Sequence, residues 1–248
     1  MFLMNQIVYL VIVLFFHPLI FITSQNTMTN HRKTASFYLL LLTILTTSLA
    51  NSQSLTENPA LDEKVKKFLS DNTHNWFDMN VPASDGQLLF DLIVSRNYKS
   101  ALEIGTSTGH SGIWIAWALS KTGGKLITIE IDEGRHRTAI ENFRKAGLSE
   151  YIDARLADAH TLVKELKGPF DFVFSDADKS WYKNYFIDVE PNLKAGGCFT
   201  AHNVFTVERG NTDGQAKFLE YVMSLKNYQT SVDITGAGLS ISYKISDQ

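Results

Sequence analysis

The sequence predicts an α/β fold, in which a largely parallel sheet carries helices on both faces. From Ser100 onward, short apolar segments alternate with amphipathic ones, and this alternation of strands and helices is typical of such sheets. A glycine-rich turn, Gly105 to Gly109, joins the first strand to the next helix. Polar and charged residues directly follow several strands. Because parallel sheets bind ligands beyond the carboxyl ends of their strands, these residues are the candidates for a site.

Two amphipathic helices are expected ahead of the sheet. Residues 59–72 place apolar side chains at helical spacing, and residues 83–97 form a second helix with Ser84 or Asp85 near its N-terminus. In the remainder, strands are expected at residues 101–104, 125–131, 152–157, 170–177, 198–204, 230–235 and 239–245. Helices are expected at residues 111–120, 134–147, 159–166 and 215–225, and residues 181–197 are expected to form a helix and its exit.

The first 50 residues differ from the rest and form a separate N-terminal apolar region, 1–50. Residues 7–22 are apolar but interrupted by His17 and Pro18, whereas residues 28–50 have the parts of a secretory signal: a basic start, a short apolar run and a small-x-small end. We expect the biological start at Met28. Export or membrane anchoring follows from this interpretation, and a cytoplasmic catalytic domain follows if the segment is only an anchor. A membrane hairpin is the alternative.

Residues 51–248 are expected to form the catalytic domain. The formal net charge of the chain is -3, which gives no basic field for nucleic acid, so no nucleic-acid partner is expected. The single cysteine, Cys198, excludes an intrachain disulfide and a cysteine cluster for zinc. Its apolar neighbours indicate a buried structural thiol.

The glycine-rich turn indicates a ligand without a pyrophosphate. Gly105 and Gly109 allow a tight turn and a close approach of the backbone to a ligand. A dinucleotide fingerprint would need a further glycine where this chain has Ser107. Glu103 ends an apolar strand, where a carboxylate is costly unless it meets a cation or a hydroxyl. A methyl donor that carries an ammonium group meets this need; a structural Arg or Lys partner is the alternative.

The next two strands indicate a nucleoside. Glu130 follows the second strand, where a carboxylate can accept both hydroxyls of a ribose, and Asp132 is its alternative. After the third strand, residues 157–160 lie where an adenine ring would rest. The small side chain of Ala159 leaves room for the ring, and His160 could stack on it or hydrogen-bond to it.

Charged residues after the fourth and fifth strands indicate the chemistry. Asp176, His202 and Asn203 could converge on one divalent cation, which would polarise a bound hydroxyl and lower its pKa. Lys179 could then take the proton as general base. The alternative is that Asp178 and Lys179 form a surface ion pair.

Together these motifs resemble the cation-dependent, S-adenosylmethionine-using O-methyltransferases of the catechol and caffeoyl-coenzyme A type, which are class I methyltransferases. The resemblance runs from about Met79 to Ile245. "LEIGTSTGHS" is similar to motif I, "TIEID" to the ribose-binding element, "DADKSWY" to the metal and base motif, and "GAGLSIS" to the turn into the last strand. It implies a Rossmann-like, doubly wound sheet of seven strands with an antiparallel last strand, and often a homodimer.

The resemblance also implies residue roles. Asp176 would be a metal ligand and Lys179 the base. Contacts with S-adenosylmethionine are implied for Val81, Glu103, Gly105, Thr106, Ser111, Glu130 and Asp178.

One residue pair departs from the family. Where the family usually has Asp-Asn after the fifth strand, this chain has His202-Asn203. Magnesium prefers oxygen ligands, whereas an imidazole ligand favours manganese, iron, cobalt, nickel or zinc. Either the metal differs, or metal dependence has been lost and His202 acts as a base; the sequence-based prediction is a retained divalent ion, magnesium or manganese.

The predicted activity is metal-assisted methylation of a hydroxyl on a small, catechol-like aromatic acceptor. Trp76, Trp181 and Tyr182 are candidate walls for the acceptor, in a pocket formed by the N-terminal helices and residues 204–214. A methyltransferase acting on a hydroxyl of a modified tRNA base and a non-catalytic S-adenosylmethionine-binding module are the alternatives. A dinucleotide oxidoreductase is disfavoured by Ser107.

Overall fold

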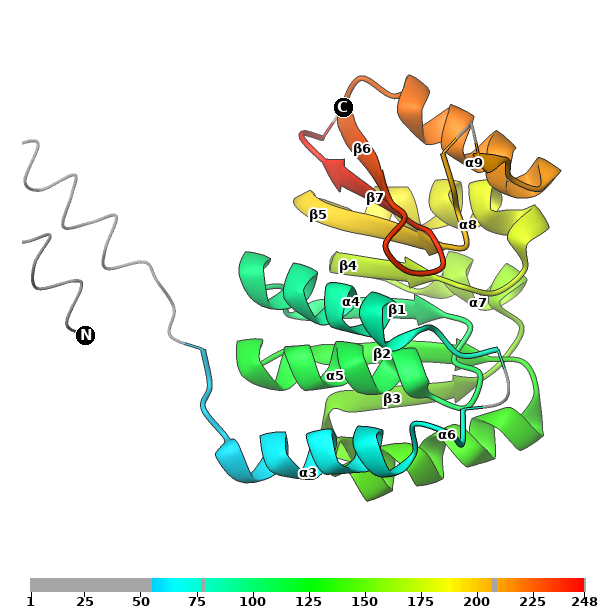
Figure 1. Cartoon of the computed structure of the whole chain (residues 1–248). Helices are drawn as coiled ribbons and strands as arrows, with labels where there is room; N and C mark the ends of the chain where they lie inside the picture. The colour runs from blue at the N-terminus through cyan, green and yellow to red at the C-terminus, as the bar shows by residue number, and fades with distance from the viewer. Residues whose placement is uncertain (1–54, 77–78, 207–208, 248) are drawn as a thin grey trace, which may run out of the picture. The chain divides into compact units, whose positions relative to one another are not determined.

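The chain folds around one seven-stranded sheet, described here from a computed structural model that covers residues 55–76, 79–206 and 209–247. The strand order is β3-β2-β1-β4-β5-β7-β6, and β7 alone runs in the direction opposite to the other six strands (Figure 1). The predicted fold class and the antiparallel last strand are therefore confirmed. The strands are β1 (Ser100–Ile104), β2 (Lys125–Glu130), β3 (Ile152–Leu156), β4 (Phe170–Ser175), β5 (Leu193–His202), β6 (Tyr228–Asp233) and β7 (Leu239–Lys244).

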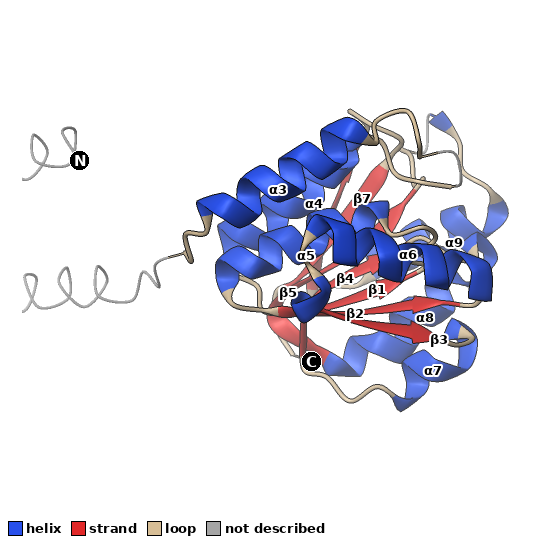
Figure 2. Cartoon of the chain, turned by 90° about the horizontal axis from the view of Figure 1, so that it is seen from below, coloured by secondary structure: helices blue, strands red, loops and turns tan. Residues whose placement is uncertain are grey.

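Helices cover both faces of the sheet, and each face has its own apolar core (Figure 2). Alternation along a strand divides the side chains between the two faces. In β4, for example, Phe172 and Phe174 join one cluster and Val173 the other. Four helices pack in the first cluster: α3 (Pro59–Asp71), α4 (Ala83–Arg96), α5 (His110–Thr122) and α6 (Glu133–Ala146). Three pack in the second: α7 (Ala159–Glu165), α8 (Tyr182–Val189) and α9 (Asp213–Ser224).

Ser84 and Asp85 lie in the first turn of α4, as the sequence predicts. The N-cap is Pro82, and no side chain caps this end of the helix. Asp85 is instead 2% exposed and lies on the buried face of α4 with Leu89 and Leu92. The carboxylate of Asp85 turns into the protein rather than back to the helix end.

Two other sequence-based predictions concern Cys198 and the N-terminal region, and the structure describes only the first of them. Cys198 is fully buried, as expected, and burial raises the pKa of its thiol. The signal-like segment and the apolar region 1–50 lie outside the described residues. Within the described part of the chain, no helix is long and apolar enough to span a membrane.

The strand order fixes where a ligand can enter. It reverses between β1 and β4, because the chain moves from β1 outward through β2 and β3 and then returns to β4 on the other side of β1. A crevice opens at such a switch point, beyond the carboxyl ends of the strands. Residues that follow β1, β2, β4 and β5 are therefore brought to one edge of the sheet.

Candidate functional site

A cavity of about 680 Å³ lies at this edge of the sheet. Its size suits a nucleoside-type cofactor together with a small second molecule. Most of its lining comes from the residues that follow the strands: Gly105 and Ser107 after β1, Glu130 and Ile131 at β2, Ala157 to His160 after β3, Asp176 to Lys179 after β4, and His202 and Asn203 at β5. The segment before α4 and the β6–β7 turn add Met79, Asn80, Pro82 and Ala237.

The glycine-rich turn is shaped by close backbone packing. Gly105 has φ +99°, and a Cβ atom there would lie 2.6 Å from the carbonyl oxygen of Asp176. Gly109 has φ +97°, and its Cβ would lie 2.7 Å from the ring of Phe143. Glycine is therefore required at both positions by the fold itself, and at Gly105 the same close approach exposes backbone to the cavity.

Glu130 is held in a fixed orientation at the cavity wall. Its Oε2 accepts a hydrogen bond from the backbone N–H of Ser107 at 2.7 Å, and its Oε1 accepts from Ile131 and Asp132 at 3.1 and 3.0 Å. The side chain is nearly buried but still lines the cavity. A carboxylate oriented in this way retains lone pairs for further donors, such as hydroxyls. Asp132, the alternative, instead caps α6 by accepting from Arg135 N.

Glu103 is a fully buried carboxyl group one layer behind the cavity. Its Oε2 accepts from Thr128 Oγ1 at 2.6 Å, whereas Oε1 has no hydrogen-bond partner among the described residues. Burial raises the pKa of Glu103 to about 7, against hydrogen bonds from Ser111 and Thr128 that favour the ionised form. An unpartnered buried carboxyl oxygen is costly, and a bound cation would relieve that cost.

The other residues expected at the methionine end of the donor do not line the cavity with their side chains. Val81 is 4% exposed, and its carbonyl oxygen accepts from His110 Nδ1 at 2.9 Å. Thr106 is turned to the Thr128 hydroxyl. Ser111 supports Glu103 by hydrogen bonding. These three residues are placed to support the turn, and any contact with a donor would come through their backbone or through Glu103.

Asn80 is a cavity residue that the sequence reasoning missed. Its Oδ1 accepts from Thr108 Oγ1 at 3.1 Å, and its buried Nδ2 has no partner in the part of the chain that the structure describes. An unpartnered amide donor is suited to an anionic group such as a carboxylate. Its signal in the sequence was weak, since one polar residue before Val81 forms no pattern.

The residues expected around an adenine ring do lie together. Ala159 and His160 line the cavity after β3. His160 stacks on Tyr185 with ring centroids 5.6 Å apart, and its Nε2 lies 3.4 Å from Oδ2 of Asp178. Asp178 also accepts from the backbone and hydroxyl of Ser180, and the hydroxyl bond above all holds the pKa of Asp178 below its usual range. The alternative in which Asp178 pairs with Lys179 does not describe this geometry.

Lys179 pairs with Asp176 instead. Lys179 Nζ lies 3.0 Å from Oδ1 of Asp176, and Asp176 Oδ2 lies 3.1 Å from Nδ1 of His202. The lysine side chain is 35% exposed, whereas the aspartate and histidine side chains are 12% and 4% exposed. The candidate base, the candidate metal ligand and the histidine of the departing motif therefore meet in one corner of the cavity.

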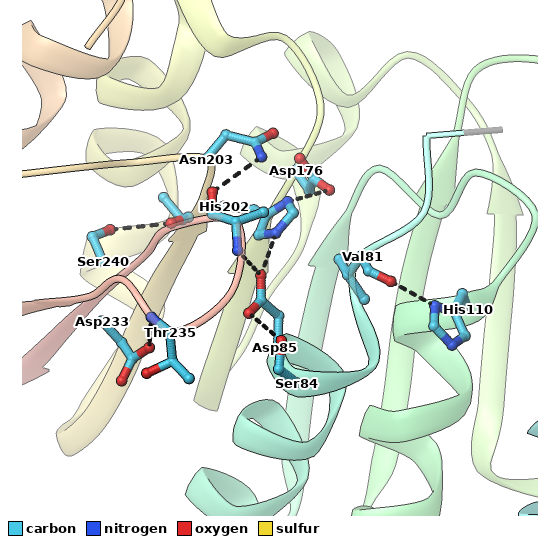
Figure 3. Close-up of polar contacts among 12 residues, drawn as sticks. Val81, Ser84, Asp85, His110, Asp176, His202, Asn203, Asp233, Thr235 and Ser240 are labelled. Carbon is cyan, nitrogen blue, oxygen red and sulfur yellow. Dashed lines mark hydrogen bonds and ion pairs between the residues drawn. The ribbon is translucent and has the colours of Figure 1, made fainter. Parts of the chain in front are cut away.

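His202 lies between two carboxylates (Figure 3). Its Nε2 is 2.8 Å from Oδ2 of Asp85, on the opposite side from Asp176. Burial alone would lower the pKa of His202, but the hydrogen bonds with Asp176 and Asp85 outweigh burial and raise the pKa to about 9. In turn, hydrogen bonding with His202 and Ala237 outweighs burial at Asp85 and holds its pKa below the usual range. The motif analysis did not include Asp85, although a lone acid on the apolar face of a helix was a signal that it needs a buried partner.

The sequence-predicted metal site does not fit this set of donors. Both oxygens of Asp176 and both ring nitrogens of His202 already face protein partners. Asn203 has φ +55° and donates from Nδ2 to the carbonyl oxygen of Ala237 at 3.4 Å. Across residues 55–247 where they are described, no cluster of three or more His, Cys, Asp or Glu side chains could hold a metal ion.

The aromatic side chains expected to wall the acceptor lie elsewhere. Tyr182 is fully buried, and its hydroxyl donates to the carbonyl oxygen of His202 at 3.1 Å. Trp181 packs against the second apolar cluster, and Trp76 stacks on His110 with ring centroids 4.5 Å apart. None of the three lines the cavity. Their spacing in the sequence could not distinguish a wall from a core position.

Comparisons with known proteins match this chain to O-methyltransferases. A family model described as O-methyltransferase matches residues 51–226. The chain is 33% identical over 165 residues to a catechol O-methyltransferase of Niastella koreensis, which covers 63% of this chain and 74% of that protein. It is 34% identical over 135 residues to caffeoyl-CoA O-methyltransferase 1 of Eucalyptus globulus, over 52% of this chain and 54% of that protein, so it spans about half of that relative. Among solved structures, the O-methyltransferase TomG of Streptomyces achromogenes in complex with S-adenosylmethionine has a TM-score of 0.62 and 25% identity, over 79% of this chain and 94% of that one.

Proposed function

The chain belongs to the O-methyltransferase family, and on that premise we propose that it methylates one hydroxyl of a small, catechol-like aromatic molecule. Its relatives and structural neighbours are S-adenosylmethionine-dependent O-methyltransferases, and this chain is an enzyme of that kind. The observation that carries the proposal is that one cavity is lined both by Glu130 and by the Asp176–Lys179 pair. The name of the Niastella koreensis relative supports a catechol as acceptor.

The donor is proposed to lie along the strand ends. Glu130 would accept the ribose hydroxyls, and Ala159 and His160 would contact the adenine. Glu103 would bind the ammonium of the methionine part through its unpartnered Oε1, and Asn80 would donate to the carboxylate from Nδ2. Within the residues that the structure describes, Glu103 Oε1 is a buried acceptor without a donor, and Asn80 Nδ2 is a buried donor without an acceptor. The ammonium and carboxylate of an amino acid would supply one partner to each.

The acceptor is proposed to bind beside Lys179. Its oxygen attacks the donor methyl carbon in line with the carbon–sulfur bond; the new carbon–oxygen bond forms, the carbon–sulfur bond breaks, and neutral S-adenosylhomocysteine leaves. Lys179, which pairs as a cation with Asp176 in the free protein, first releases a proton from Nζ to water and then accepts the hydroxyl proton. Orientation of the two reactants and the charges around the oxygen supply the rest of the rate enhancement.

The apolar parts of the same corner favour a ring over a sugar or a phosphate. Pro82 and Ala237 line the cavity that His202 also lines, and the backbone N–H of Ala237 donates to Asp85. Flat apolar walls beside a few polar groups are typical of sites for small aromatic molecules.

The test combines donor binding with turnover. S-adenosylhomocysteine is titrated into the full chain by calorimetry, and methylation of catechol is followed by mass spectrometry with benzene as a blank and guaiacol as the single-hydroxyl comparison. Binding together with O-methylated catechol supports the proposal. Binding without turnover over a broad panel of hydroxylated acceptors would favour the non-catalytic module, and no binding by folded protein would contradict the donor site.

Three further expectations stay predictions. A homodimer would be detected by sedimentation of the full chain. Export or membrane anchoring through residues 28–50 would be detected by fractionation of cells that express the chain. The absence of a nucleic-acid partner would be contradicted by binding to tRNA at physiological salt.

A further inference from the structure

We infer that the side chain of His202 is a fixed cation that takes the place of a divalent metal ion, so that methyl transfer by this chain requires no metal. This inference rests on the proposed function and deepens it. It names the charge that would stabilise the acceptor oxygen, and it assigns to Asp85 the role of positioning that charge.

The geometry at His202 calls for a hydrogen on each ring nitrogen. Nε2 faces Oδ2 of Asp85 at 2.8 Å, and Nδ1 faces Oδ2 of Asp176 at 3.1 Å. An ionised carboxylate can only accept a hydrogen bond, so each nitrogen must be the donor. An imidazole that donates from both nitrogens is the imidazolium cation.

Asp85 is fixed in place from several sides. Its Oδ2 also accepts from the backbone N–H of Ala237 at 3.0 Å, and Ser84 Oγ lies 3.3 Å from its Oδ1. Gly236 packs so closely on the carboxylate that a Cβ atom there would overlap Oδ1. Asp85 therefore fastens the β6–β7 turn and α4 to the same ring. The ring of His202 cannot rotate without breaking both of its hydrogen bonds.

The charges in this corner already balance. Asp85 and Asp176 are countered by His202 and Lys179, at contacts of 2.8 to 3.1 Å. Sites that hold magnesium or calcium concentrate oxygen ligands and negative charge. Here the candidate ligand oxygens of Asp176 are occupied by two cationic donors, so neither the charge nor the free lone pairs favour a metal ion.

A fixed cation can perform the electrostatic part of the metal's work. His202 and Asn203 line the cavity, so the positive charge lies at the wall where the acceptor would bind. A nearby positive charge lowers the pKa of a hydroxyl and stabilises the oxygen anion that attacks the methyl group. The hydroxyl proton still passes to Lys179 after Nζ has released its own proton to water, and no further reactant is needed.

In the competing arrangement, Asp85 accepts from His202 Nε2 while a metal ion binds to His202 Nδ1. In many metal sites, a carboxylate accepts from one ring nitrogen while the other nitrogen binds the metal. Here that arrangement would need the His202 Nδ1 proton to leave and a metal ion to enter between Nδ1 and Asp176. Direct metal binding distinguishes the two.

The first experiment titrates manganese into the full chain saturated with S-adenosylhomocysteine and measures free manganese by electron paramagnetic resonance. The wild-type chain is expected to bind no manganese at millimolar metal. His202→Asp restores the Asp-Asn pair usual in the family and is expected to bind one manganese ion per chain. Stoichiometric manganese binding by the wild type that is lost in His202→Ala would overturn the inference, as would a folded His202→Asp variant that binds none.

The second measurement reads the protonation of His202 in the wild-type chain, and a variant is used only to assign the signal. In histidine labelled with nitrogen-15, the imidazolium has two protonated nitrogens with similar shifts, whereas neutral imidazole has two very different ones. His202, assigned by its loss in His202→Gln, is expected to show the imidazolium pattern at neutral pH. A neutral pattern would contradict the inference. Binding of S-adenosylhomocysteine in the same samples reports on the proposed function separately, because the donor site does not include His202.

Discussion

Thr128 Oγ1 donates a 2.6 Å hydrogen bond to Oε2 of Glu103 across the paired strands β2 and β1, and neither residue is exposed to solvent. One oxygen of the carboxyl group is thereby held in the sheet, while the other has no partner in the described structure. A titratable group that is buried and half-satisfied in this way is expected to change its protonation when its ligand binds.

Donor binding should therefore depend on pH through Glu103. The pKa of Glu103 is about 7 in the free protein, and an ammonium ligand favours the ionised form, so binding must expel a proton wherever the free protein holds one. Affinity for S-adenosylhomocysteine is expected to fall by up to about tenfold per pH unit below pH 7 and to be nearly constant above it. Calorimetry across this range checks the slope. Glu103→Gln should bind more weakly at neutral pH and lose the slope; a slope that persists in this variant would contradict the assignment.

Glu130 should contribute more to donor binding than the neighbouring Asp132. Glu130→Ala removes the acceptor for the ribose hydroxyls and is expected to weaken S-adenosylhomocysteine binding by about 100-fold, since hydrogen bonds to charged groups contribute about 1.5–3 kcal/mol. Asp132→Ala is the matched control, because Asp132 caps α6 and should affect stability more than affinity. Titration of both variants, with unfolding measured alongside, decides between the two carboxylates. Equal losses in the two variants would contradict the ribose role of Glu130.

Gly105→Ala should destabilise the fold more than Gly123→Ala. Both residues have positive φ, +99° and +75°, but only at Gly105 would the added Cβ meet backbone, the carbonyl oxygen of Asp176. We expect Gly123→Ala to lower the free energy of unfolding by about 1 kcal/mol and Gly105→Ala by about 3 kcal/mol, because overpacking adds to the backbone strain. Urea unfolding of the two variants measures this difference. Similar values would mean that the turn after β1 can relax away from β4.

Lys179 should contribute to turnover and little to donor binding. Lys179→Ala removes the proposed proton acceptor and is expected to lower kcat by about 10²–10⁴-fold while the affinity for S-adenosylhomocysteine stays close to that of the wild type. The control is Lys183→Ala, since Lys183 lies over the ring of Tyr221 and does not line the cavity. Steady-state kinetics with the acceptor found in the assay provides the measurement. Unchanged kcat in Lys179→Ala would assign the proton to another group.

The placement of most residues that are proposed to hold the donor could be predicted from the sequence. The alternation of strands and helices determines a parallel sheet, and the strand-end rule then places Glu130, Ala159 and Asp176 at one edge. These inferences succeed because they depend on local periodicity and on a topology that strands of this kind share. The side-chain walls of the acceptor were not predictable in the same way, since Tyr182 and Trp181 have apolar surroundings in either case.

The sequence by itself determined the fold class, the order of the motifs and the replacement of the family's aspartate by His202. Tertiary structure alone decided which groups surround the ring of His202. Asp85 and His202 are 117 residues apart in the chain, and no local pattern connects them. They meet because α4 and the β6–β7 turn pack against the end of β5, and the protonation of His202 depends on the two carboxylates that this packing brings to its ring. The sequence determines which residue stands at position 202, whereas the pKa of its side chain, and so its charge, depends on its neighbours in space.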